Sequence, residues 1–262
     1  MRRYALLLYI AVRTSALLAL QYRLDFFVQS LMALVWSATA IAPLLVLFQL
    51  RESVAGWTAH GALVVVGFFV AIKGILLGVV QPSLANVVEH IRKGTLDFLL
   101  LKPADAQFML STSKLDLARM TDVAAGASLS GWAAARAGAA FTPAQLMATA
   151  FMLLCALAIL YSLWVLVVSL SFRVVKVDNL SFLLMGVFDA ARFPASIFRG
   201  ALSLVFTFVL PLAVMTTYPA LAILGRADGA HLVVAAVVSG GFVVASRAVW
   251  KWSLHLYTGA GG

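Results

Sequence analysis

GALVVVGFFVAIKGILLGVVQPSLANVV, residues Gly61–Val88, decides the fold of this chain. It is a long apolar run in which Lys73 is the only charged residue. A helix needs about 20 apolar residues to cross the hydrocarbon core of a bilayer. The run therefore predicts a helix that spans a membrane.

Further apolar segments of spanning length lie on both sides of this run. Some are uncharged, some carry charges in their last turns, and two carry charged residues within the segment or at both of its ends. In chain order they are Phe26–Leu50, Leu115–Ala135, Ala144–Phe172, Val174–Phe193 and Leu232–Trp252. Together with residues 61–88 they predict an all-α, polytopic membrane protein with six transmembrane helices.

The composition agrees with this class. Of 262 residues, 63% are hydrophobic and 11% are charged, whereas about 25% of the residues in a soluble domain are charged. The net charge of +9 comes from basic residues at the ends of apolar segments, a pattern typical of the positive-inside rule rather than of nucleic-acid binding. We expect one transmembrane domain over residues 1–262. Its expected partner is the lipid bilayer, and we expect it to bind no nucleic acid.

Two segments are predicted to lie at the membrane surfaces. Residues 1–23 contain Arg2, Arg3, Arg13 and Arg23 among apolar residues, which favours an interfacial helix against anionic headgroups. Residues 200–225 are uncharged but contain Pro211 and Pro219, and proline breaks a helix. We therefore interpret residues 200–225 as a re-entrant helical hairpin on the outer side, before the last span.

The distribution of lysine and arginine sets the orientation. With six spans, most of them fall on the side that holds residues 89–114, and a seven-span alternative, in which residues 200–225 cross fully, changes this balance little. The positive-inside rule then places both termini and residues 89–114 in the cytoplasm.

Charged residues within the predicted spans form a second group of candidates. Asp116, Arg119 and Asp122 are spaced three apart, so one helix would place them on one face. A charge at the centre of a spanning helix costs roughly 2.5–3.5 kcal/mol on insertion scales, so such residues pair or face the interior. We favour a structural ion-pair network, with a substrate or proton pathway as the alternative, and extend this to Lys73 and to Asp189 with Arg192.

A stripe of small residues runs along the second span. Gly67, Ala71, Gly74 and Gly78 recur at helical spacing, and small residues let two helices approach closely. The stripe predicts a packing face within the subunit or between subunits. An unbroken helix would bring Glu89 onto the same face, so that the cytoplasmic segment and this helix would move together.

Residues 89–103, EHIRKGTLDFLLLKP, form a basic stretch with turn signals between two apolar segments. An ordinary basic loop would also fit. However, the order of glutamate, Gly-Thr-Leu-Asp, a leucine run and a proline resembles the cytoplasmic segment after the second span of ABC type-2 exporter permeases. The matching residues are Glu89, Gly94, Thr95, Leu96, Asp97 and Pro103.

The resemblance extends along the chain. The segment DAARFPASIFRGALSLVFTFVLPLAVMTTYPALAILG, Asp189–Gly225, is similar to the corresponding pattern of one permease subgroup. The resemblance implies a permease subunit of an ATP-driven exporter in the bacterial inner membrane, working as a dimer with an identical or homologous permease and contacting an ABC ATPase through residues 89–103. It identifies no substrate.

Sequence motifs bear on the chemistry that this chain carries. The phosphate-binding loop G-x-x-x-x-G-K-S/T is absent from the sequence. We therefore expect no catalytic residue here, and ATP and Mg on the partner ATPase. Four histidines, at positions 60, 90, 231 and 255, show no metal-ligand spacing, so no metal site is expected. The alternative function is an ion- or proton-coupled secondary transporter that uses the charged third span.

Overall fold

The computed structural model describes residues 2–101, 105–172, 178–198 and 200–255. The described part is almost entirely helical, apart from a two-stranded hairpin that pairs β1 (Ser53–Val54) with β2 (Trp57–Thr58). The helical elements are α1 (Arg2–Gln21), α2 (Arg23–Leu50), α3 (Ala59–Ile75), η1 (Leu76–Val80), α4 (Gln81–Arg92), α5 (Asp97–Leu100), α6 (Ala106–Ser111), η2 (Leu117–Arg119), α7 (Met120–Arg136), α8 (Pro143–Ser169), η3 (Leu170–Phe172), α9 (Asp178–Phe188), η4 (Asp189–Arg192), η5 (Ala195–Ile197), α10 (Ala201–Leu204), η6 (Val205–Val209), η7 (Ala213–Thr217), α11 (Tyr218–Ile223) and α12 (Gly229–His255).

Length and apolar composition identify five of the described helices as candidate membrane spans. They are Tyr4–Gln21, Arg23–Leu50, Ala59–Ile91, Pro143–Phe172 and Gly229–His255. A sixth is added if the bent pair 201–209 and 213–223 counts as one span. The predicted all-α, polytopic class is therefore confirmed. The spans predicted at residues 115–135 and 174–193 contain helices shorter than predicted, since α7 has 17 residues and α9 has 11.

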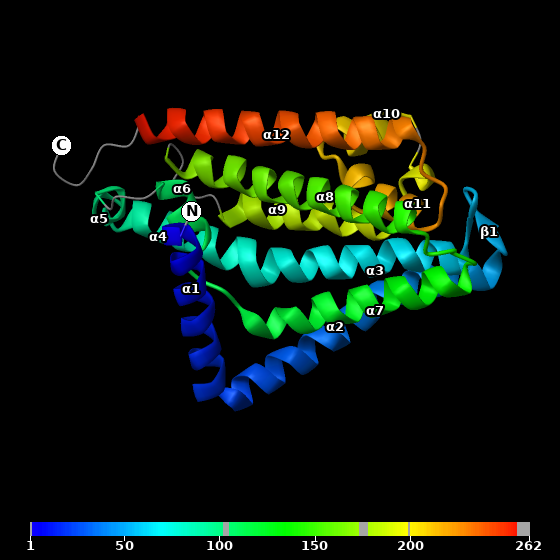
Figure 1. Ribbon diagram of the computed structural model, residues 1–262, viewed down its shortest axis with the longest axis horizontal. Coiled ribbons are helices and arrows are strands. Elements are labelled where there is room, and N and C mark those ends of the chain that lie inside the picture. Colours follow the sequence, from blue (N-terminus) through cyan, green and yellow to red (C-terminus); the bar gives the residue numbers. More distant parts are fainter. Residues whose placement is uncertain (1, 102–104, 173–177, 199, 256–262) are drawn as a thin grey trace.

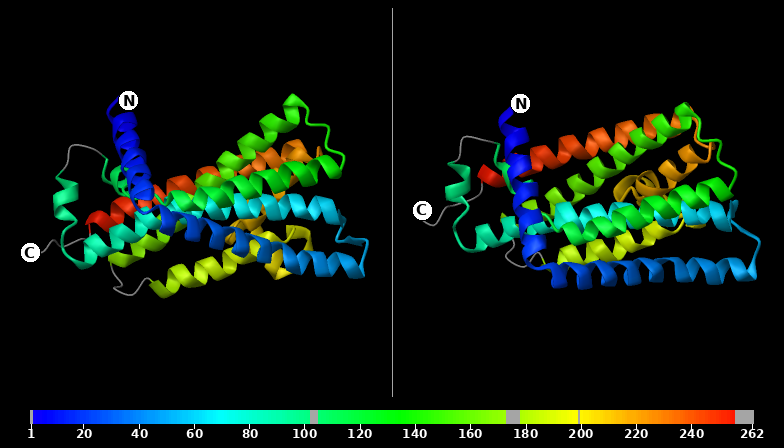
Figure 2. Two further views of the ribbon diagram at one scale, coloured as in Figure 1. Left: turned by 90° about the horizontal axis from the view of Figure 1, so that it is seen from below. Right: turned by 60° about the horizontal axis from the view of Figure 1, so that its bottom comes forward.

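The long helices run roughly along one direction, with α1 as the exception. Figures 1 and 2 show α1 crossing one end of the bundle, where α5, α6 and the last turns of α12 also lie. The β1–β2 hairpin lies at the opposite end (Figure 1). Its turn residues Ala55 and Gly56 have φ of 49° and 83°, the backbone that a tight two-residue hairpin requires.

The second span is one continuous helix, α3–η1–α4, with a π turn at its centre. Pro82 has no N–H and its ring crowds the carbonyl four residues earlier, which belongs to Gly78. The structure resolves this conflict by widening residues 76–80 into a π turn. The Gly78 carbonyl accepts instead from the Asp116 amide at 2.8 Å, which pins the start of the third span to the middle of the second.

The small-residue stripe packs α3 against α7 within the subunit. A Cβ built on Gly67 would lie 2.3 Å from the Ser130 hydroxyl and 2.6 Å from its amide. One built on Gly126 of α7 would lie 2.4 Å from the Ala71 amide. Gly74 and Gly78 face the same partner segment, with Val123 and Met120 as neighbours. The two backbones are therefore too close for any side chain at these positions.

The third span starts later than the sequence indicates. We expected one helix over residues 115–135, with Asp116 on it. Instead, the Asp116 carboxylate accepts from the Ala118 amide at 3.1 Å and caps the short 3-10 turn η2. An aspartate that bonds the backbone two residues ahead favours a turn over a helix interior. As a result, α7 begins at Met120, and Asp116 and Arg119 precede it.

The remaining helices enclose the core on the other side of α3. Helix α8 packs along α12 and against α11, and its first turn is fixed by Thr142, which caps the Gln145 amide, and by Pro143. In the segment 200–225, the two helical halves are bent by 70°. The bend falls at Leu210–Leu212 between η6 and η7, where Pro211 cannot donate a backbone hydrogen bond.

Candidate functional site

A cavity of about 1480 Å³ lies between α2, the α3–α4 helix, α8 and α9. Small-molecule sites in proteins usually measure about 300–1,000 Å³, so this one is large. Its lining combines aromatic side chains with seven charged ones. The charged ones are Lys73, Glu89, Lys93, Arg119, Asp122, Asp189 and Arg192.

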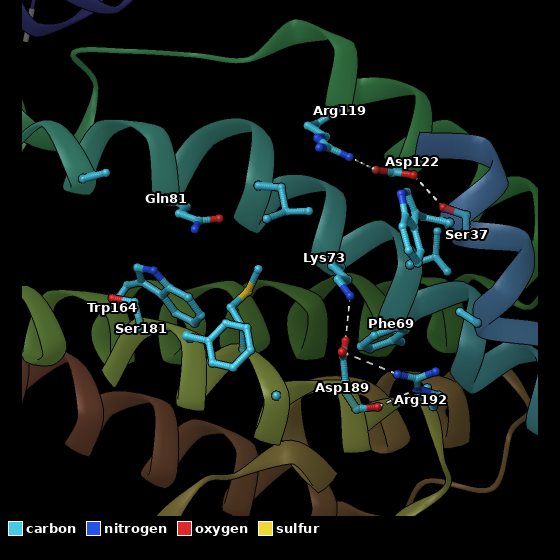
Figure 3. Close-up of a pocket in the computed structure, with 18 of the residues that line it drawn as sticks. Ser37, Phe69, Lys73, Gln81, Arg119, Asp122, Trp164, Ser181, Asp189 and Arg192 are labelled. Carbon is cyan, nitrogen blue, oxygen red and sulfur yellow. Dashed lines mark hydrogen bonds and ion pairs between the residues drawn. The ribbon is translucent and has the colours of Figure 1, made fainter. Parts of the chain in front are cut away.

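Two cations share one carboxylate on one wall of the cavity. The Lys73 ammonium lies 2.6 Å from Asp189 Oδ1, and the Arg192 guanidinium lies 3.5 Å from Asp189 Oδ2 (Figure 3). Arg192 Nε also donates to the Asp189 carbonyl at 2.8 Å. The expected pairing of Asp189 with Arg192 is present. The bond to Lys73 was not predicted, because it joins positions 116 residues apart.

The ring of Phe69 lies beneath both of these cations. The Lys73 ammonium is 5.4 Å and the Arg192 guanidinium 5.7 Å from its centroid. The ring itself is buried, with 1% of its surface exposed. An aromatic face within about 6 Å attracts a cation. Phe69 therefore holds two positive side chains at the surface of the cavity.

A second charged group lies on the α7 side of the cavity. Arg119 is 3.8 Å from both Asp116 and Asp122, and Ser37 donates to Asp122 at 2.5 Å. Asp122 is 6% exposed. The structure thus brings the three predicted residues together around Arg119 and adds Ser37 of α2, which no sequence pattern indicated. Figure 3 shows this group across the cavity from Asp189.

Polar side chains also interrupt the apolar part of the lining. Gln81 of α4, Trp164 of α8 and Ser181 of α9 all line the cavity and are labelled in Figure 3. Trp164 is 2% exposed, and its indole N–H has no hydrogen-bond partner in the described structure. A buried donor without a partner is uncommon in folded proteins. This part of the lining therefore retains an unused hydrogen-bond donor.

The end of the cavity coincides with the start of the predicted coupling segment. Glu89 and Lys93 line it, with the Lys93 ammonium 2.5 Å from the Glu89 carboxylate. The expectation that Glu89 shares a face with the small-residue stripe is wrong, because that stripe faces α7 whereas Glu89 faces the cavity. The π turn adds a residue to the helix and rotates α4 by about 100° relative to α3.

A glycine-based cap ends α4 within this segment. Gly94 has a φ of +65°, its amide donates to the Ile91 carbonyl, and the Thr95 amide donates to the His90 carbonyl. This is the Schellman arrangement, which glycine adopts without strain. Thr95 also bonds His90 through its side chain at 2.8 Å, and Leu96 is fully buried. The turn is therefore held at a fixed angle to α4.

The short helix α5 follows the cap, with Asp97 as its first residue. Phe98 and Leu101 are 71% and 82% exposed, so two large apolar side chains face away from the protein. Apolar exposure next to charged residues is typical of a binding surface. The last residue of the predicted motif, Pro103, lies outside the described residues.

Polar side chains at positions 105 and 107 bond to two distant helices, α8 and α12, and we call this group of contacts the clasp. Arg247 of α12 pairs with the Asp105 carboxylate and bonds the Gln107 side chain. Gln107 donates to the Tyr161 hydroxyl of α8 at 3.0 Å. The bond from Arg247, and then the Phe108 amide, lower the pKa of Asp105 below its ordinary value. No sequence pattern could indicate this clasp, because Asp105 and Arg247 are 142 residues apart.

Metal ligands do not gather anywhere in the described part of the chain. No group of three or more histidine, cysteine, aspartate or glutamate residues there could hold a metal ion. The lining of the cavity consists of paired charges, aromatic rings, aliphatic side chains and a few hydrogen-bonding groups.

Comparison with known proteins gives one match. A family model described as ABC-2 family transporter protein matches residues 34–261. That range includes every residue that lines the cavity and the whole of residues 89–114. No curated protein and no solved structure gives a significant match.

Proposed function

Since the chain belongs to the ABC-2 transporter family, we propose that it is the permease subunit of an ATP-driven exporter and that the cavity forms part of its substrate path. The family accounts for a transport subunit in a membrane. The direction of transport, the coupling to ATP and the route of the substrate are the proposed parts.

One observation carries the proposal. The continuous helix α3–η1–α4 lines the cavity from Phe69 to Glu89 and then ends in the fixed turn at Gly94. A rigid helix moves as one body, so a displacement of the turn moves the cavity wall. Energy that enters at the turn can therefore reach Lys73 without an intermediate element.

The ATPase is proposed to be a separate chain that binds at residues 89–103. Glu89, Gly94, Thr95, Leu96 and Asp97 shape the turn, and Phe98 with Leu101 supplies the exposed apolar contact. ATP and Mg would bind the partner. We further propose that residues 89–114, α1 and both termini lie at the cytoplasmic face of a bacterial inner membrane, with residues 200–225 at the outer face.

A second permease, identical or homologous, is proposed to complete the path. Trp36 of α2 and Phe182 of α9 line the cavity while remaining 69% and 78% exposed. The cavity therefore opens at an edge bordered by these two helices. A second subunit against this edge would enclose the path.

The test is co-purification. The tagged permease is co-expressed with ABC ATPases from the same genome, and co-elution and nucleotide turnover are measured. Gly94→Pro, Asp97→Lys, and Phe98→Ser combined with Leu101→Ser should each lower ATPase recovery while membrane insertion persists. Phe141→Ser, which changes an exposed aromatic in the loop between α7 and α8, is the matched control and should change nothing.

A secondary transporter is the second candidate, and the cavity ion pairs favour it. A carboxylate that bonds a lysine in the path, as Asp189 does with Lys73, can exchange a proton or cation. This candidate requires transport that follows a proton gradient without any bound ATPase. That result, together with no ATPase in the eluate, would overturn the proposed exporter.

A further inference from the structure

The cavity offers a ligand more accessible positive charge than negative charge. Lys73, Arg192 and Arg119 expose 32%, 24% and 29% of their side chains. Of the carboxylates near them, Asp189 is 36% and Asp116 is 35% exposed, whereas the Asp122 side chain is only 8% exposed and accepts from Ser37. At the mouth of the cavity, Glu89 and Lys93 are 58% and 64% exposed and pair with each other. The lining has four cations and three carboxylates, one of which is nearly buried, so a molecule that enters the cavity meets a net positive charge.

The excess of positive charge is concentrated around Asp189. Lys73 and Arg192 together carry two positive charges, and Asp189 supplies one negative charge between them. A cation that lacks its counter-charge in an apolar setting is costly. A bound anion would remove this cost, and the planar guanidinium of Arg192 suits phosphate or carboxylate oxygens.

The rest of the cavity suits a long apolar group. Trp36 and Phe182 stand at its open edge, and Leu77, Val88 and Met185 line it further in. Its volume of about 1480 Å³ exceeds what a drug-sized ligand fills. An apolar chain can therefore enter from the bilayer side while a polar head reaches Lys73.

We propose that the cavity binds an amphiphile with an anionic head, whose phosphate or carboxylate lies between Lys73 and Arg192 and whose chain lies along the apolar lining. This rests on the proposed function, because it assigns a substrate class to the same cavity.

The experiment uses the full chain in phosphatidylcholine nanodiscs, without the ATPase. Lysophosphatidate, a fatty acid and a monoacylglycerol, each with the same dibrominated chain, are titrated while quenching of tryptophan fluorescence is followed. At least one anionic amphiphile should bind roughly tenfold or more tightly than the neutral acylglycerol. The tighter of the two anions identifies the head as phosphate or carboxylate.

Variants assign the binding to the two cations. Lys73→Gln and Arg192→Gln should each weaken anion binding roughly tenfold or more, while acylglycerol binding persists and shows that the protein is folded. Arg51→Gln, which removes an exposed cation outside the cavity lining, is the control and should stay within about twofold. If Lys73→Gln fails to fold, Arg192→Gln decides the question, because it leaves the Lys73–Asp189 bond intact.

Three results would overturn the inference. They are equal affinity for the anionic and neutral amphiphiles, unchanged anion affinity in both variants, and displacement of the anion by inorganic phosphate at equal concentration. The binding assay contains no ATPase, so its result is independent of the co-purification test. Anion binding in this assay, with no ATPase co-eluting in the other test, would contradict only the proposed function. Co-elution without anion binding would contradict only this inference.

Discussion

The two faces of α3 differ in what they contact. One face carries Gly67, Ala71 and Gly74 and lies so close to α7 that an added Cβ would collide with backbone atoms. The other face carries Phe69 and Lys73 and borders an open cavity. A single helix thus has a closely packed side and a side with free space.

The difference shows which interactions hold the helix and which remain free for a ligand. Close packing on the α7 side fixes α3 by dispersion contacts over many atoms. On the cavity side, the helix presents one charge, Lys73, held by few partners, which a ligand or a conformational change can replace. Changes on the packed face should therefore affect stability, and changes on the cavity face should affect binding.

The largest effect is expected from Gly126→Ala, which tests the packed face. The new Cβ would lie 2.4 Å from the Ala71 amide and 2.5 Å from the Gly67 carbonyl, so α3 and α7 must separate. We expect a loss of about 3 kcal/mol of unfolding free energy, at the upper end for overpacking. Thermal unfolding of the detergent-purified protein measures it.

Gly131→Ala is the control on the same helix, because nothing lies within 4 Å of its Cβ position. It should be neutral or gain up to about 1 kcal/mol, since glycine lowers helix stability. Equal melting temperatures for the two variants would contradict the close approach of α3 and α7.

A smaller effect is expected from Asp189→Asn on the cavity face. The change removes the negative charge that Lys73 and Arg192 share, and a hydrogen bond to a charged group contributes roughly 1.5–3 kcal/mol. We expect a loss at the lower end of that range, because about a third of each partner remains exposed. Thermal unfolding again provides the measurement.

The matched control is Glu89→Gln, which breaks an ion pair at the mouth of the same cavity. Glu89 and Lys93 are 58% and 64% exposed, so the cost should stay below about 1 kcal/mol. A larger loss for Glu89→Gln than for Asp189→Asn would show that the Lys73–Asp189 pair contributes less to stability than the Glu89–Lys93 pair.

The clasp between Asp105 and Arg247 lies outside both faces of α3. Its contribution to stability depends on pH. Since the pKa of Asp105 is lowered in the folded protein, its contribution is present above the ordinary value of 3.8 and is lost as the pH falls through the lower folded value. Asp105→Asn should reduce stability by roughly 1 kcal/mol at pH 7. The gap between wild type and variant should narrow as the pH falls below 3.8.

Melting temperatures of the wild type and of Asp105→Asn, measured from pH 7 to pH 3, test this prediction. A gap that stays constant over this range would mean that the carboxylate charge contributes nothing to the clasp.

The smallest effect is expected from Gln81→Leu, a change of similar volume on the cavity face. Because this side chain borders free space, stability should change by no more than about 0.5 kcal/mol. The same unfolding assay applies. A loss comparable to that of Gly126→Ala would mean that the cavity face is as closely packed as the other.

The sequence was informative where a feature is local and periodic. Apolar runs predicted the long helices, and the recurrence of Gly67, Ala71, Gly74 and Gly78 predicted a packing face, which the structure places against α7. The turn at Gly94 could also be anticipated, because glycine is suited to a left-handed helix cap.

Features that join distant parts of the chain could not be predicted. The partner of Lys73 lies 116 residues away, and the partner of Arg247 lies 142 residues away. The cavity exists only because α2, α4, α8 and α9 leave space between them. Asp116 was misplaced on a helix because an aspartate that caps a turn and one inside a helix look alike in a pattern of spacing.

The π turn at residues 76–80 acts as one inserted residue in an otherwise regular helix. Deleting a residue there, together with Pro82→Ala, would restore an unbroken α-helix. The surface around Glu89 and Gly94 would then turn by about 100° relative to Lys73. Homologous chains without a proline at this point are therefore expected to be one residue shorter, with the gap in the alignment falling inside the membrane rather than in a loop.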